Sequence, residues 1–161
     1  MNWYRRSGRD TNTLAGVDYR RQDVSYDRLK RGRWPRELRT IRKVLPEHLQ
    51  KAPPLGTAAY GSWIVVASVE KGAVGFAWAV HEAGNPHGAY IEEVAVLPEF
   101  QRRGIGSQLV RTLALWMCEL DRQDLSILPI SGSGWLRRLG FSKSPFGSGY
   151  MANASEVARF A

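Results

Sequence analysis

The chain has 161 residues and 43% hydrophobic content, which suits one compact domain with a single core and leaves no room for a second domain. No stretch approaches the roughly 20 apolar residues that span a bilayer, and the N-terminus lacks the apolar centre of a secretory signal, so we expect a soluble, cytoplasmic protein. The single Cys118 excludes an intramolecular disulfide, and three scattered histidines offer no zinc spacing, so we expect no metal site.

The formal net charge of +8 is concentrated at one end of the chain. Residues 1–50 hold 13 Lys and Arg against 6 Asp and Glu, whereas residues 51–161 hold 10 against 9. Two interpretations stay open. The basic third is either a solvated surface, or a contact surface for phosphates or acidic groups, a nucleic acid included.

The chain begins with residues 1–15, which lack apolar periodicity and predict a flexible basic arm in front of a single domain at 16–161. Residues 17–24 alternate apolar and polar side chains and predict a short strand. Pro35 then stands at a plausible first position of a helix that extends to residue 45. Together these segments predict a strand followed by helices over about 26–45.

The helix at 35–45 is amphipathic and basic. Its apolar side either packs on the core or binds a membrane surface, and nearby Trp34 either packs beside it or stacks on a base. The apolar positions are Leu38, Ile41 and Leu45, and the basic positions are Arg36, Arg39 and Lys43.

The central part of the chain predicts strands. Three apolar segments separated by short Gly-containing turns read as consecutive antiparallel strands, at 62–70, 73–81 and 89–97. Helical spacing of apolar residues follows at 105–120. Because that helix joins 89–97 to a buried strand at 124–130, a right-handed crossover should make those two strands parallel.

The remaining segments predict a loop and short helix at 131–140 and a last strand pair, 141–144 with 149–154. The order of elements is therefore that of a mixed α/β (α+β) fold.

The glycine loop "QRRGIG" at 101–106 lies between a strand and a long helix. The first amides of a helix have no intrahelical partners, and their dipoles favour an anion at that end. Gly104 and Gly106 leave these amides accessible because they carry no Cβ, and Arg102 and Arg103 add positive charge. The loop is therefore interpreted as a phosphate cradle.

Two segments resemble the GNAT superfamily of acyl-coenzyme A N-acyltransferases. "YIEEVAVLPEFQRRGIGSQLV" at 90–110 is similar to the central motif of the family, and "GWLRRLGF" at 134–141 to its short fourth helix; the resemblance covers about 60–145. It implies a mixed central sheet in the order strand, two helices, three strands, helix, strand, helix, strand. The sheet would splay between its fourth and fifth strands, here 89–97 and 124–130.

The resemblance also implies where acetyl-coenzyme A, as cosubstrate, would bind. The backbone amides of 102–107 would hold the pyrophosphate, and 94–97 would border the pantetheine arm in the splay. The residues implied in cofactor binding are Val94, Ala95, Val96, Leu97, Gln101, Arg102, Arg103, Gly104, Ile105, Gly106 and Ser107.

Acyl transfer to an amine needs a base, because an ammonium has no lone pair. Adjacent Glu92 and Glu93 should point to opposite faces of their strand, and we favour Glu92 as the base. Its position resembles the first carboxylate of a Glu-Asp pair in polyamine-acetylating members of the family. The alternative is that both are ordinary rim carboxylates that balance nearby arginines.

The family often uses a Tyr of the fourth helix to protonate the leaving thiolate, and this chain has Leu136 there. Either another group serves, with Ser133 and Tyr150 the nearest candidates, or the thiolate leaves unassisted. Cys118 reads as a packed thiol rather than a nucleophile.

Two classes of function follow. The first is an N-acetyltransferase that acts on a primary amine. The second is a coenzyme A-binding or nucleic-acid-associated module that has lost turnover. A third possibility combines both classes: acetylation of an amine that is carried on a nucleic acid or on its bound protein. The basic residues of 35–45 led us to expect an acidic acceptor whose binding weakens with salt. Monomer and homodimer are both compatible with the sequence.

Overall fold

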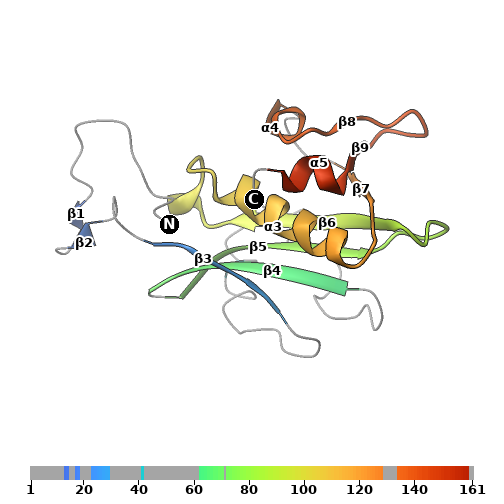
Figure 1. Ribbon diagram of the computed structural model, residues 1–161. Coiled ribbons are helices and arrows are strands. Elements are labelled where there is room, and N and C mark those ends of the chain that lie inside the picture. The colour runs from blue at the N-terminus through green and yellow to red at the C-terminus, as the bar shows by residue number, and fades with distance from the viewer. Residues whose placement is uncertain are drawn as a thin grey trace.

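The computed structural model describes residues 13–14, 17–18, 23–29, 41, 62–70, 72–128 and 134–159. In this part of the chain, one seven-stranded mixed sheet dominates (Figure 1). Its strands are β3 (Ser25–Arg28), β4 (Ser62–Val69), β5 (Gly72–His81), β6 (Gly88–Val96), β7 (Asp124–Ile127), β8 (Ser142–Lys143) and β9 (Tyr150–Asn153). The helical elements are η2 (Pro98–Phe100), α3 (Ile105–Glu119), α4 (Gly134–Arg138) and α5 (Ala154–Ala158).

The strands lie in the order β3-β4-β5-β6-β7-β9-β8. All neighbours are antiparallel except β6 and β7, which are parallel. Because α3 connects these two strands, the expectation of a helical connection between parallel strands is confirmed. The three predicted antiparallel strands and the helix from Ile105 are also confirmed, and the mixed α/β fold class with them.

Apolar side chains bury the sheet on both faces. One cluster lies under α3 and includes Leu109 and Leu113, both 0% exposed. A smaller cluster contains Phe76 and Trp78. Phe76 and its neighbour Ala77 belong to different clusters, so the clusters lie on opposite faces of β5. Burial on both faces explains the nearly continuous apolar sequence of this strand.

The sheet opens between β6 and β7. Their pairing begins at Gly88 opposite Asp124 and ends at Ile91 opposite Ile127. The rest of β6, residues 92–96, continues without a strand on that side among the described residues. This is the splay that the family resemblance implied between the fourth and fifth strands of the central sheet.

A β-bulge in β6 lies at the start of the opening. Glu93 is opposite Trp78 of β5, and Ile91 is opposite the next residue, Ala79, so Glu92 is the extra residue between them. A bulge bends a strand and redirects its side chains. It therefore sets the orientation of the acidic pair that the sequence singled out.

The N-terminal third differs from the prediction at the strand that joins the main sheet. The strand of the main sheet is β3, which begins at Ser25 and not within the predicted 17–24. Its pairing with β4, Ser25 opposite Ser68, selects this segment. Residues 26–28, which we had included in the helical region, are therefore strand.

Two two-residue strands, β1 (Thr13–Leu14) and β2 (Val17–Asp18), form a separate antiparallel pair. The first falls inside the predicted flexible arm, 1–15, whose remainder lies outside the described residues. Ile41 is helical and buried, in agreement with its predicted place on an apolar helix face. The other residues of the predicted basic helix lie outside the described part of the chain.

The sequence analysis missed α5. Its N-cap is Asn153, whose side chain accepts a hydrogen bond from the Ser155 amide at 2.9 Å. Asn153 followed three residues later by Glu156 is a recognisable helix-start signal. None of the described helices is both long enough and apolar enough to span a membrane.

Candidate functional site

The glycine loop has a backbone that only a few residues adopt easily. Gln101 donates a side-chain hydrogen bond from Nε2 to the carbonyl of Val96 at 2.9 Å, which ties the loop to the end of β6. Arg102 and Gly104 both have left-handed backbones, with φ of 60° and 81°. Glycine removes the steric cost at 104, which is the N-cap of α3. The hydrogen bond from Gln101 therefore helps to fix the conformation of the loop.

The first turn of α3 presents amides to the loop. The Gln108 amide donates to the Gly104 carbonyl at 3.0 Å, the first bond of the helix, so the amides of Ile105, Gly106 and Ser107 precede the helical ladder. The N-cap residue, Gly104, has no side chain that could cap this end. The geometry is that of an anion site, because the amides and the helix dipole both favour negative charge there.

The two loop arginines differ in setting. Arg102 is exposed beside the amides. Arg103 is half-buried, and its guanidinium lies 5.6 Å from the Phe100 ring centre. Burial lowers the pKa of Arg103, although a guanidinium remains protonated at neutral pH. Both arginines thus add positive charge near the helix start.

The opened edge of β6 leads directly to this anion site. Val94 and Val96 pack toward the α3 cluster, and Ala95, on the opposite face, is buried. A Cβ built on Gly106 would lie 3.9 Å from Val96 and 4.0 Å from Val94, so the helix start packs closely on the strand. An extended arm ending in phosphates fits this edge, with its phosphates at the first turn of α3.

Glu92 and Glu93 have different environments. Glu92 is exposed, and it is the first residue of β6 beyond the last pair with β7. Glu93 is 5% exposed and shares the sheet face of Trp78, away from α3. A solute can reach Glu92 directly, whereas the protein encloses Glu93.

Tyr90 lies near Glu92. It is opposite Val80 in the sheet, which places it on the face away from α3. Burial raises the pKa of Tyr90, the charge of Glu92 raises it further, and a hydrogen bond with the Leu128 backbone opposes the rise. Tyr90 is therefore a neutral phenol at physiological pH. The sequence analysis did not select it.

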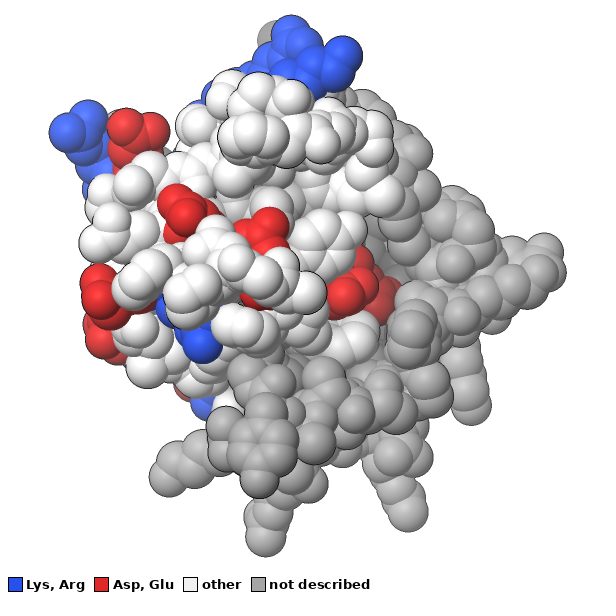
Figure 2. All heavy atoms as spheres, turned by 90° about the vertical axis from the view of Figure 1, so that its right-hand side faces the viewer, with Lys and Arg blue, Asp and Glu red and all other residues white. Residues whose placement is uncertain are grey.

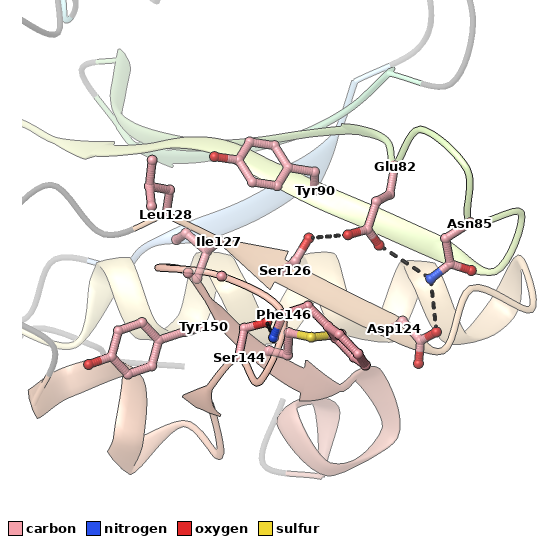
Figure 3. Close-up of a pocket in the computed structure, with 13 residues that line it drawn as sticks. Glu82, Asn85, Tyr90, Asp124, Ser126, Ile127, Leu128, Ser144, Phe146 and Tyr150 are labelled. Atoms are coloured by element: carbon pink, nitrogen blue, oxygen red, sulfur yellow. Dashed lines mark hydrogen bonds between the residues drawn. The ribbon is translucent and has the colours of Figure 1, made fainter.

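A pocket of about 600 Å³ lies in front of Tyr90. The β5–β6 turn, β6, β7 and the β8–β9 connection line it (Figure 3). Figure 2 looks onto this end of the molecule and shows acidic side chains across its middle. The polar lining residues among those described are Glu82, Asn85, Tyr90, Asp124, Ser126, Ser144 and Tyr150.

Comparison with known proteins identifies the family. A model of the GNAT acetyltransferase domain matches residues 60–143, which are 84 of the 161 residues. The chain belongs to the GNAT acetyltransferase family. No curated protein matches it in sequence.

Solved structures agree with this assignment at the level of the fold. One assigned as an acetyltransferase from Exiguobacterium sp. 255-15 has a TM-score of 0.64 at 18% identity and covers 85% of this chain and 97% of its own. One assigned to the GNAT family from Desulfovibrio desulfuricans has a TM-score of 0.62 at 19% identity, with coverages of 81% and 96%. An IAA acetyltransferase from Bacillus cereus has a TM-score of 0.61 at 15% identity, with coverages of 81% and 99%.

This GNAT protein departs from the familiar pattern at the thiolate acid. Leu136, at the usual Tyr position, is 0% exposed and packs in the α3 cluster. Tyr150 belongs to the same large cluster, is 8% exposed, and lines the pocket in front of Tyr90. Ser133 lies outside the described residues.

Cys118 is half-buried in α3. Burial raises the pKa of its thiol, with an opposing backbone hydrogen bond and a further increase from the charge of Glu119. The thiolate is the reactive form of cysteine. Cys118 is therefore suited to packing, as the sequence analysis favoured.

Proposed function

We propose that this GNAT protein is an N-acetyltransferase that moves an acetyl group from acetyl-coenzyme A to a primary amine by direct attack. The observation that carries the proposal is the continuous path from the opened edge of β6, residues 92–96, to the first-turn amides of α3. Two independent features meet there, an unpaired strand edge and an anion site. Both fit a long extended ligand that ends in a pyrophosphate.

The proposed residue roles follow from position. The amides of 102–107 hold the pyrophosphate, Arg102 and Arg103 add charge, and Gln101 fixes the loop. Val94 to Leu97 border the pantetheine arm. When bound, acetyl-coenzyme A supplies a thioester whose carbonyl carbon bonds to the amine nitrogen as its bond to sulfur breaks.

Glu92 is the proposed base. It takes the proton that the amine must lose, directly or through water, and it is exposed at the start of the opening. Tyr90, held neutral, is placed to hydrogen-bond the incoming amine and orient it. Tyr150 is the proposed donor of the proton to the departing sulfur, because it is a phenol that lines the same pocket as Tyr90.

The proposal is tested by mixing the full chain with acetyl-coenzyme A and a panel of primary amines while free thiol is measured. An N-acetyltransferase releases thiol only when an amine is present, and mass spectrometry finds the acetylated amine. Amine-independent thiol release, or coenzyme A binding with no product from any amine, would favour the alternative of a binding module without turnover.

Replacement of Tyr150 by Phe should lower kcat by roughly tenfold, less than the usual effect of a general acid because a thiolate is a tolerable leaving group. Steady-state kinetics with saturating substrates measures the change. The affinity for coenzyme A, measured by calorimetry, should stay the same. An unchanged kcat in a folded Tyr150→Phe protein means that Tyr150 is not the proton donor, which leaves Ser133 or an unassisted thiolate.

The predicted role of Arg36, Arg39 and Lys43 in holding an acidic acceptor lies outside the described residues. It stays a prediction, as does binding to a nucleic acid. A salt titration of binding to polyanionic and neutral candidates, compared with a variant in which these three charges are reversed, tests it. The charged side chains that line the pocket in front of Tyr90 are acidic, opposite in sign to these three basic residues.

A further inference from the structure

The pocket in front of Tyr90 contains a pair of carboxylates, and Tyr90 itself feels the charge of Glu92 at the opening of the sheet. Tyr90 is opposite Ser126 in the parallel pair, and Asp124, two residues earlier on β7, shares the same face. In Figure 3, Tyr90 and Leu128 lie toward one end of the pocket, and Asn85 and Asp124 lie at the other. The pocket is therefore elongated along the strands.

The charged residues that line the described pocket are Glu82 and Asp124. Their hydrogen-bond donors are neutral. Ser126 Oγ donates to Glu82 Oε1 at 2.9 Å, and Asn85 Nδ2 lies 3.3 Å from Glu82 Oε2 and 3.0 Å from Asp124 Oδ2. These bonds hold both carboxylates in place. They leave both negative charges uncompensated, with lone pairs for further donors.

Arg122, a basic residue close in sequence to Asp124, has its hydrogen bonds with other groups. Arg122 donates to the carbonyls of Pro86 and Gly88, at 3.2 Å and 2.9 Å, and contacts His81. Its guanidinium lies 4.6 Å from the ring centre of Trp63. In the part of the chain that the structure describes, no ion pair involves either pocket carboxylate.

The pocket also offers apolar surface, part of it at the end where Tyr90 lies. Leu128 is 51% exposed and Phe146 is 89% exposed, and both line it. Such side chains suit a hydrocarbon segment better than a second charged group. The distance between the ends follows from the strand. Gly88, opposite Asp124, is four residues from Glu92, which corresponds to roughly 13 Å of strand.

We infer that this pocket binds the acceptor, and that the acceptor is a linear amine with a second positive charge, a diamine or polyamine. One ammonium binds the carboxylate lone pairs of Glu82 and Asp124 that Asn85 and Ser126 leave open, the hydrocarbon segment lies along Leu128 and Phe146, and the reacting amine reaches past Tyr90 to Glu92. This inference rests on the proposed function and names the substrate class of the same site. The expected separation of the two nitrogen atoms is on the order of 10–13 Å.

The inference is tested with three acceptors of equal chain length: an α,ω-diamine, the corresponding monoamine, and the corresponding amino acid with a carboxylate at the far end. Thiol release should give the diamine a kcat/KM at least about tenfold above the monoamine, because a charge-assisted hydrogen bond contributes that much. The amino acid should be the poorest. Among diamines, kcat/KM should rise with length to a maximum near the separation given above.

The variants are Asp124→Asn and Glu82→Gln, which keep shape and remove charge. Each should shrink the diamine-to-monoamine ratio toward one while calorimetric affinity for coenzyme A stays unchanged. Glu156→Gln, an exposed carboxylate on α5, is the matched control and should leave the ratio unchanged. Equal kcat/KM for diamine and monoamine in the wild type, or a ratio unaffected by either pocket variant, overturns the inference.

A binding measurement separates this inference from the proposed function. Calorimetry of the diamine against the wild type saturated with free coenzyme A needs no turnover. Diamine binding that Asp124→Asn weakens, without acetylated product from any amine, supports the pocket and contradicts the proposed function. Acetylated monoamines with no diamine preference support the proposed function and contradict the pocket.

Discussion

Replacement of Glu92 by Gln should lower kcat/KM by about 100-fold near pH 7, within the range of general-base catalysis. The effect should shrink as pH rises. An alkylamine has an ordinary pKa of about 10, so each unit of pH below that value reduces the neutral fraction about tenfold. Wild-type enzyme removes the proton itself, whereas the variant depends on amine already neutral in solution. Rates of both proteins measured from pH 6 to pH 9 show the difference.

Two comparisons test the assignment of Glu92 as the base. Glu93→Gln should lose less activity than Glu92→Gln, because Glu93 is enclosed by protein and Glu92 is exposed at the opening. Tyr90 does not generate the pH dependence, since its raised pKa keeps it protonated throughout this range. Parallel pH profiles for Glu92→Gln and wild type, or a larger loss in a folded Glu93→Gln protein, would show that Glu92 is not the base.

The sheet around the site was predictable because its strands are local patterns with clear ends. The apolar segments at β4, β5 and β6 are separated by Gly-containing turns, and α3 has helical spacing from its first residue. The start of β3 was not predictable in the same way. Among the four residues of β3 only Tyr26 is half-buried, so the strand has no alternation of apolar and polar side chains. Its place is fixed by pairing with β4.

The candidate phosphate loop could be proposed from the sequence because one continuous segment contains all of its functional groups. The pocket has no such signal. Glu82 and Asp124 are 42 positions apart, and they meet because β6 and β7 pair in parallel and Asn85 bridges them. In the sequence, the region of Asn85 signals only a turn. The bulge at Glu92 is equally invisible, because it arises from the register between β5 and β6.

Replacement of Gly104 by Val should weaken coenzyme A binding by roughly 100-fold, the loss expected when about two hydrogen bonds to a charged group are removed. Gly104 has φ of 81°, which a β-branched residue adopts only with strain, so the substitution moves the amides that follow. A Cβ on Gly104 would also project where no protein atom lies within 4 Å, toward space that an anion would use. Calorimetry with free coenzyme A measures the affinity.

The protein offers a matched control for the backbone strain itself. Gly84, in the β5–β6 turn, has φ of 78°, and a Cβ there would also meet no atom within 4 Å. Gly84→Val should therefore cost about the same folding free energy, on the order of 1–2 kcal/mol, without changing the cradle. Thermal unfolding should be similar in the two variants and coenzyme A affinity should fall only in Gly104→Val. If a folded Gly104→Val protein binds coenzyme A like the wild type, the pyrophosphate does not rest on the first turn of α3.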